Sequence, residues 1–171
     1  MTIGLSALEI FDIAEQIEES GAIFYRKAAG LFDNPQTKKI FLQLADWEVK
    51  HKKLFSDMSK RLIESKTFER VEKTNNLSLL AGLSVFAIRP NPQDIFSGRE
   101  DEMAIIKSAI EKEKDSVVFY SGLKEYVPET TDKETIDKVI KEEIHHIGIL
   151  GRLYRRKRNI GKDREMYQTG S

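Results

Sequence analysis

The same pattern of glutamate, aromatic and histidine residues occurs twice in this chain, at a constant offset of 95 positions. In each copy a lone glutamate is followed by a Phe-Tyr pair and then, 30 residues after that glutamate, by a Glu-x-x-His motif. The two copies are Glu18, Tyr25, Glu48 and His51, and Glu113, Tyr120, Glu143 and His146. One Glu-x-x-His motif arises easily by chance. A second copy in register indicates a duplicated structural unit.

Apolar residues recur every three to four positions around each part of the repeat, which is the period of an amphipathic helix. Four helices are predicted, from about Ser6 to Ala29, Pro35 to Ser65, Gly98 or Arg99 to Val127, and Asp132 to Arg158. The turn at Asp33-Asn34-Pro35 separates the first two helices, and the Val127-Pro128 step separates the last two. The predicted fold class is therefore all-α, with residues 6–65 and 99–158 forming two antiparallel helical hairpins.

The link between the hairpins is longer than a tight turn requires. Residues 66–98 contain Pro90-Asn91-Pro92 and an apolar run, Leu77–Ile88. We expect this link to cross the length of a four-helix bundle. The apolar run is expected to form a subunit contact in a homodimer, with covering of the bundle as the alternative. Residues 159–171 are expected to form a polar, frayed tail, so that residues 1–171 make one domain.

The charged residues of the repeat interrupt the apolar faces of their helices. A three-residue spacing places the glutamate and histidine of each motif on one face. Four buried carboxylates would each cost several kcal/mol and would repel one another, which a net stability of about 5–15 kcal/mol cannot carry. Two divalent cations would neutralise them, with two imidazoles completing the ligand set. The predicted metal ligands are Glu18, Glu48, His51, Glu113, Glu143 and His146, with Glu48 and Glu143 as bridging carboxylates.

The donor types limit the choice of metal. Carboxylate oxygen and imidazole suit iron or manganese, and zinc is a further alternative. The chain has no cysteine, which excludes disulfides, thiolate catalysis and iron–sulfur or rubredoxin-type sites from these residues. We therefore expect two iron ions as the cofactor.

The last helix offers two overlapping Glu-x-x-His pairs. Glu142 with His145 has the same spacing as Glu143 with His146. Only the second pair lies 95 positions from Glu48 and His51, and only it falls on the apolar stripe. We interpret His145 as a residue at the surface or behind the ligands. Trp47, the one tryptophan, is expected to serve packing.

The repeated Glu-x5-Phe-Tyr and Glu-x-x-His elements resemble the ferritin-like superfamily, and within it the diiron domain of the rubrerythrin family. The resemblance covers residues 6–158 and implies a ferritin-like bundle with a diiron site. It also implies that Tyr25 and Tyr120 stand behind the ligands. The implied activity is reduction of hydrogen peroxide or dioxygen, in protection against oxidative stress. The alternatives are a ferroxidase or iron carrier without redox turnover, and a structural bundle stabilised by zinc.

The sequence departs from the rubrerythrin pattern in two respects. It lacks the cysteines of a rubredoxin-like domain, so the electron donor is expected to be a separate rubredoxin-like protein or flavoprotein. The family also has a further glutamate three residues after the third-helix ligand, where this chain has Ser116 and, in the first half, Gly21. We expect a symmetric site, with room beside these small residues for water, dioxygen or peroxide.

Charge and hydropathy give no sign of other partners. The 28 basic and 28 acidic residues balance, so nucleic acid is not expected. The longest apolar run is too short to span a bilayer and no signal peptide is recognised, so we expect a cytoplasmic protein outside the membrane. The basic residues between Arg152 and Arg158 are expected to form a solvated helix end, with docking of an acidic redox partner as the alternative.

Overall fold

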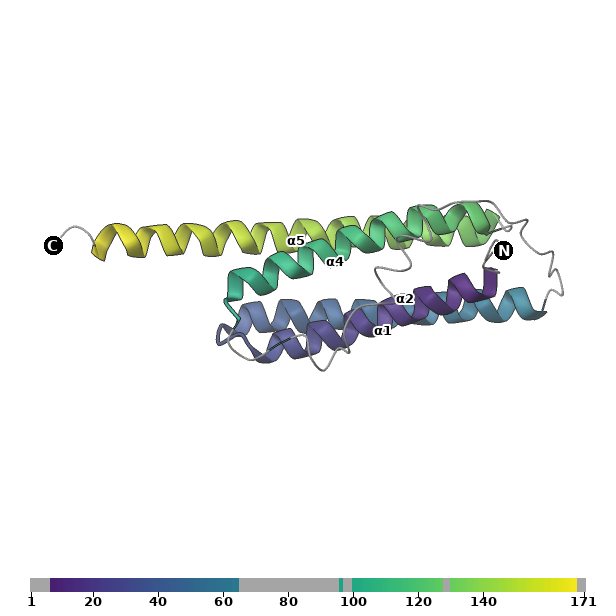
Figure 1. The fold of residues 1–171 in the computed structure, drawn as a ribbon, viewed down its shortest axis with the longest axis horizontal. Coiled ribbons are helices and arrows are strands. Elements are labelled where there is room, and N and C mark those ends of the chain that lie inside the picture. Colours follow the sequence, from purple (N-terminus) through teal and green to yellow (C-terminus); the bar gives the residue numbers. More distant parts are fainter. Residues whose placement is uncertain (1–6, 65–95, 97–99, 128–129, 169–171) are drawn as a thin grey trace, which may run out of the picture.

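The computed structural model describes residues 7–64, 96, 100–127 and 130–168. Its elements are α1 (Ala7–Gly30), α2 (Pro35–Glu64), α4 (Glu102–Leu123), the short 3-10 helix η2 (Lys124–Tyr126) and α5 (Thr130–Gln168). Within these ranges there is no strand. Figure 1 shows α1 lying antiparallel to α2, and α4 antiparallel to α5, with the two pairs packed together. The predicted all-α four-helix bundle is confirmed.

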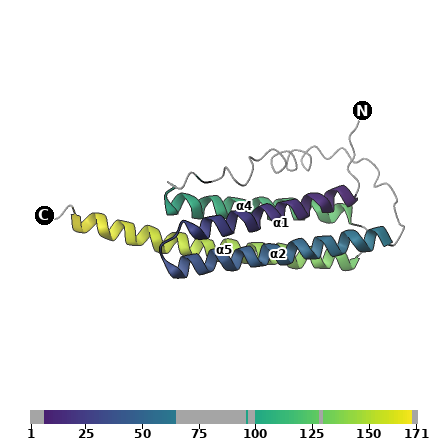
Figure 2. The same ribbon diagram turned by 90° about the horizontal axis from the view of Figure 1, so that it is seen from below.

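The two hairpins are related by a crossover. α2 ends at one end of the bundle and α4 begins at the other end, so these two helices run in the same direction (Figures 1 and 2). A tight turn cannot make such a connection. Residues 66–95 and 97–98, which include the Leu77–Ile88 run, lie outside the described residues. Phe96 is described, and its ring packs against Phe24 with the centroids 5.2 Å apart.

The helix boundaries follow local sequence signals. The side chain of Asn34 accepts hydrogen bonds from the backbone N–H groups of Gln36 and Thr37, both at 3.0 Å, and so caps α2. Pro35 occupies the first helical position, where its missing N–H costs nothing. α4 begins at Glu102, slightly later than expected, because Asp101 keeps an extended backbone with φ −63° and ψ 135°. Ser6, the predicted start of the first helix, lies outside the described residues.

α5 is longer than the sequence pattern indicated. The helix was expected to end near Arg158 and to be followed by a frayed tail, but it continues to Gln168. This prediction was wrong because a single glycine, Gly161, costs a helix only about 1 kcal/mol, and the residues around it are mostly good helix formers without a proline. Figure 2 shows the last part of α5 projecting beyond the other three helices. None of the described helices is long and apolar enough to cross a membrane.

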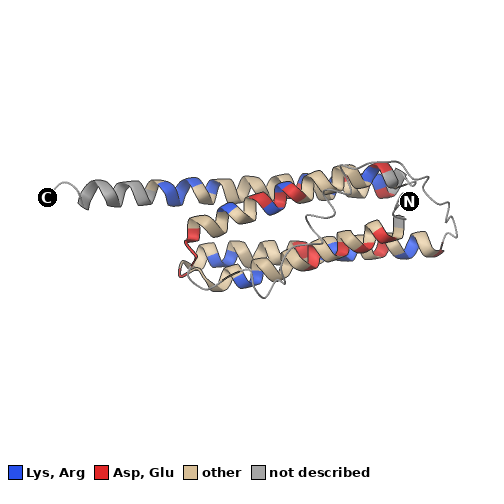
Figure 3. Cartoon of the chain, in the orientation of Figure 1, with Lys and Arg blue, Asp and Glu red and all other residues tan. Residues whose placement is uncertain are grey.

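Basic residues collect where α5 reaches the end of the bundle (Figure 3). Arg152, Arg155, Arg156 and Arg158 are exposed, as expected for a solvated helix end. Lys157 differs from them, because it pairs with Glu102 of α4 and lies 5.6 Å from the ring centre of Phe32. Lys157 therefore links α5 to the first turn of α4 at this end of the bundle.

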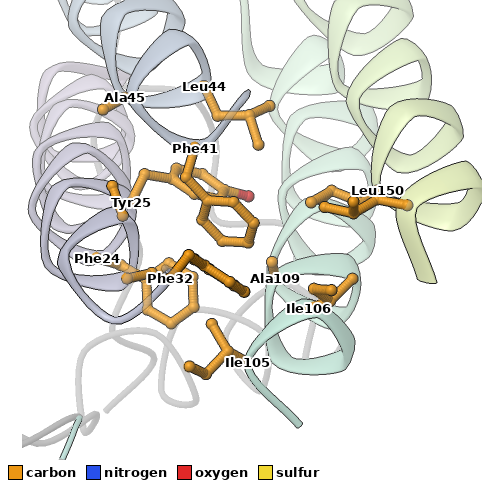
Figure 4. Packing of buried hydrophobic residues seen from close by; sticks show 13 residues of the cluster. Phe24, Tyr25, Phe32, Phe41, Leu44, Ala45, Ile105, Ile106, Ala109 and Leu150 are labelled. Carbon is orange, nitrogen blue, oxygen red and sulfur yellow. The ribbon is translucent and has the colours of Figure 1, made fainter. Parts of the chain in front are cut away.

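The core consists of two apolar layers. One layer gathers Phe24, Phe32 and Phe41 with Ile105, Ile106 and Leu150. Figure 4 shows these side chains converging from the four helices and, for Phe32, from the turn between α1 and α2. The other layer gathers residues nearer the opposite end, among them Ile10, Phe55, Met58, Phe119, Leu123 and Ile136. In every helix the glutamates and histidines of the repeat fall between the members of these two layers. A polar layer is thus enclosed between two apolar ones.

Candidate metal centre

All six predicted ligands meet in the polar layer between the two apolar layers. None of them exposes more than 4% of its surface. α1 supplies Glu18, α2 supplies Glu48 and His51, α4 supplies Glu113, and α5 supplies Glu143 and His146. Their donor atoms form two groups, each within 4.8 Å: Glu48, Glu113, Glu143 and His146 in one, and Glu18, His51 and Glu143 in the other. The arrangement therefore offers two adjoining places for a cation.

Glu143 lies at the centre of the cluster and is shared by both groups. The Nδ1 atom of His146 hydrogen-bonds to Oε2 of Glu143 at 3.0 Å, and Nδ1 of His51 lies 2.9 Å from Oε1. The same two nitrogens face the lone glutamates, with His51 3.6 Å from Glu18 and His146 3.7 Å from Glu113. Each imidazole thus directs Nδ1 toward the carboxylates. Glu143 is the candidate ligand that belongs to both groups, whereas Glu48, the other predicted bridging carboxylate, belongs to one.

Two tyrosines contact the lone glutamates across the bundle. Tyr25 of α1 donates a hydrogen bond to Glu113 of α4, and Tyr120 of α4 donates one to Glu18 of α1. Burial raises the pKa of both phenols well above the ordinary value, and the nearby carboxylates raise it further. Both phenols consequently keep their protons. The tyrosines stand behind the candidate ligands, as the resemblance implied.

Burial and mutual repulsion dominate the electrostatics of the carboxylates. Burial raises the pKa of Glu48 well above its ordinary range, and the charge of Glu18 adds to this effect. Burial, together with the charge of Glu143, raises the pKa of Glu113 to about 8. For Glu143, burial acts in the same direction, but its contacts with His146 and His51 hold its pKa below the ordinary range. Glu143 is therefore the anionic carboxylate, and its charge favours the protonated form of the neighbouring carboxyl groups.

The histidines carry the compensating charge in the metal-free chain. Burial alone would lower the pKa of each imidazole, but the neighbouring carboxylates outweigh it. They raise the pKa of His51 to about 11 and that of His146 to about 9. Protons thus supply positive charge that a metal ion would otherwise bring. Metal binding has to displace these protons.

Three buried atoms of the cluster have no hydrogen-bond partner. They are Oε2 of Glu18, Nδ1 of His51 and Oε1 of Glu143, and all belong to one of the two candidate groups. Nδ1 of His51 lies 3.6 Å from the Glu18 oxygen and 2.9 Å from the Glu143 oxygen, close enough for an ion pair but not in hydrogen-bond geometry. Buried polar atoms normally have partners, and orphaned ones cost about 1–3 kcal/mol each. Two carboxylate oxygens and an imidazole nitrogen directed at one another without hydrogen bonds form a donor set for a cation. The residues present therefore fit a metal ion.

The space expected beside Gly21 is not free. A Cβ atom at Gly21 would lie 2.6 Å from Oε2 of Glu48 and 3.0 Å from its carboxyl carbon. The missing side chain of Gly21 thus allows the Glu48 carboxylate to lean against α1, and the expectation of room for an added ligand was wrong at this position. Ser116, the equivalent residue of α4, is buried at 8% exposure.

Two residues near the cluster were not recognised from the sequence as parts of it. Glu142 accepts a hydrogen bond from Nε2 of His51 at 2.7 Å. Trp47 stacks on the ring of His146, with the centroids 4.6 Å apart and the planes at 20°. Both precede a candidate ligand by one residue, and 95 positions separate them. The offset that linked the ligands would also have linked these two. His145 is exposed, in agreement with the choice of Glu143 and His146.

The comparisons with known proteins agree with this geometry. The family model described as rubrerythrin matches residues 9–154, which include all six candidate ligands. The chain belongs to the rubrerythrin family. Among solved structures it is similar to a candidate ferritin-like diiron-carboxylate protein from Thermotoga maritima, with a TM-score of 0.69 and 25% identity over 90% of this chain and 97% of that one. A comparison with curated proteins finds no match.

Membership of the rubrerythrin family gives the buried cluster its interpretation. The bundle is ferritin-like, and Glu/His clusters between its helices are the place where such bundles build di-metal carboxylate centres. A Glu from each of two helices and a Glu-x-x-His pair from each of the other two is that ligand arrangement. The cluster is thus a candidate di-metal centre.

Proposed function

We propose that this protein is a non-haem diiron-carboxylate oxidoreductase that reduces hydrogen peroxide or dioxygen. Glu18, Glu48, His51, Glu113, Glu143 and His146 would hold the two iron ions. The orphaned atoms of Glu18, His51 and Glu143, which converge without hydrogen bonds in a sealed layer, are the observation that carries this proposal. Carboxylate and imidazole donors support iron over softer metals.

When bound, two Fe(II) ions would supply the two electrons that, together with two protons, reduce one hydrogen peroxide to two waters. The chain's own residues would prepare the site for it. Glu143 lies between the two histidines and would be a ligand of both ions. The apolar layers on either side exclude bulk water from the site. This exclusion strengthens the electrostatic interactions in the cluster.

The two tyrosines would fix the lone glutamates. The hydroxyl of Tyr25 holds its proton against Oε1 of Glu113, and that of Tyr120 holds its proton against Oε1 of Glu18. In each case Oε2 is left to face an imidazole, which is the direction in which a ligand oxygen is needed. Hydrogen bonds of this kind orient metal ligands and keep them in place.

The reductant and the assembly are also part of the proposal. These 171 residues contain no cysteine, so we propose that electrons come from a separate rubredoxin-like protein or flavoprotein. A cytoplasmic homodimer is the proposed setting. Size measurement in solution tests the dimer, and reduction of the oxidised protein by each donor class tests the reductant.

Stopped-flow mixing tests the activity itself. The full chain, loaded anaerobically with Fe(II), should consume one hydrogen peroxide for every two Fe(II), with an absorbance increase in the near ultraviolet as Fe(III) forms. His51→Ala should abolish this fast phase, whereas His145→Ala should keep it because His145 is exposed. Oxidation no faster than that of free Fe(II) would contradict the proposal. Uptake of many irons per chain would instead indicate a ferroxidase.

A further inference from the structure

Different residue types contact the outer sides of the two candidate histidines, a carboxylate at His51 and an indole at His146. His51 lies between two adjacent glutamates of α5, with Nδ1 2.9 Å from Glu143 and Nε2 2.7 Å from Glu142. Glu142 reaches the ring from the surface, since its side chain is 56% exposed. His51 therefore has a carboxylate on each ring nitrogen.

The repeat places a tryptophan where His146 would need the matching carboxylate. Trp47 lies 95 positions before Glu142 and stacks on the face of the His146 ring. An indole has only a hydrogen-bond donor, so Trp47 cannot accept a proton from an imidazole N–H. Among the described residues, the carboxylates that pair with His146 are Glu113 and Glu143, and both face Nδ1.

This difference has a direct consequence for metal binding. A carboxylate on the outer nitrogen of a histidine fixes the tautomer and the ring orientation, and it strengthens the other nitrogen as a ligand. Loss of such a partner typically lowers metal affinity by about 10–100-fold. A stacked indole restricts the ring plane but gives no comparable electrostatic support. The ligands themselves are related by pseudo-symmetry, but the residues that contact the outer sides of the two histidines are not.

We propose that the two metal positions differ in affinity, with the ion on His51 bound more tightly than the ion on His146. Glu142 is the positioning residue that strengthens metal binding at His51. Trp47 occupies the equivalent place beside His146 and leaves metal binding there weaker. This inference rests on the proposed di-metal centre, and it assigns an order of loading that the ligand set alone does not give.

Zn(II) titration of the metal-free full chain tests the order. Calorimetry should resolve two equivalents whose affinities differ by about tenfold or more. Trp47 is the only tryptophan, so its fluorescence reports on the His146 ring that it touches. The fluorescence change should accompany the second equivalent. Redox-inert zinc keeps this readout independent of activity.

Variants separate the two supports. Glu142→Gln is a nearly isosteric change at an exposed position. It should lower the affinity for the first zinc ion by about 10–100-fold and leave the affinity for the second unchanged. In Trp47→Glu, calorimetry should show tighter binding of the second zinc ion and a smaller difference between the two affinities. Glu134→Gln, an exposed glutamate elsewhere on α5, is the matched control and should change neither.

The outcomes distinguish this inference from its premise. Two zinc ions that bind with equal affinity, or a Glu142→Gln variant with wild-type affinities, would overturn the asymmetry and leave the di-metal centre intact. Absence of zinc binding in a folded, helical protein would overturn both. Circular dichroism of each variant confirms that the bundle is folded.

Discussion

Tyr25 on α1 donates a hydrogen bond to Glu113 on α4, although 88 residues separate them. Tyr120 makes the reciprocal contact to Glu18. Each half of the duplicated chain thus supplies the tyrosine that restrains the lone glutamate of the other half. The two hairpins are joined through the cluster as well as through their apolar layers.

Removal of one of these hydroxyls should destabilise the metal-free protein. In Tyr25→Phe, Glu113 loses its donor while remaining buried, which should lower the free energy of unfolding by about 1–3 kcal/mol. The loss should be smaller in the metal-loaded protein, where the ion also restrains Glu113. Urea denaturation followed by circular dichroism measures both values. Tyr154→Phe, at a partly buried tyrosine outside the cluster, is the control. Equal losses with and without metal would argue against Glu113 as a ligand.

The fall of stability with rising pH should be confined to the metal-free protein. In the metal-free protein the pKa values of Glu113, His146 and His51 are raised to about 8, 9 and 11. The folded state then binds protons more tightly than the unfolded chain, so stability should fall as pH rises from about 6 to about 9. Metal binding displaces these protons and becomes stronger over the same range.

The measurement is the melting temperature of metal-free and metal-loaded protein across that range. The difference between the two temperatures should widen steadily as pH rises. A constant or shrinking difference would mean that the ion does not compete with the protons of His51, His146 and Glu113.

The absence of a side chain at Gly21 should matter for metal affinity. In Gly21→Ala the new Cβ would displace the Glu48 carboxylate, which lies 2.6 Å from its position. Metal affinity should drop by at least about tenfold, as expected when the support of a ligand is disturbed. Gly148→Ala is the control, because its Cβ would meet only the flexible end of Arg152 at 3.5 Å. That change should keep affinity and can stabilise α5 by up to about 1 kcal/mol. Wild-type affinity in Gly21→Ala would refute the contact with Glu48.

The six candidate ligands could be predicted because two independent regularities select them. They lie on apolar helix faces, where a charged residue is costly, and they recur at one offset. Glu142 and Trp47 share the offset of 95, but they are residues of different type and do not lie on the apolar faces, so neither regularity predicts their contacts with the histidines. Their contacts depend on α2 and α5 lying side by side, which the pattern within one helix does not contain.

The remaining differences have similar causes. The space beside Gly21 is filled by a side chain from the neighbouring helix, so its occupation depends on how α1 and α2 pack. α5 continues past Gly161 because local helix propensity persists after the amphipathic pattern has faded. Apolar periodicity in a sequence indicates which part of a helix is buried. A helix that projects beyond its bundle therefore continues past the last residue of its apolar pattern.

The buried cluster of glutamates and histidines should bind two metal ions. Anomalous diffraction at the iron absorption edge, from crystals of the Fe(II)-loaded protein grown without oxygen, tests it most directly. We expect two peaks inside the bundle, one beside His51 and Glu18 and one beside His146 and Glu113, with Glu143 in contact with both. A bundle interior without an anomalous peak, or a single peak away from Glu143, would contradict it.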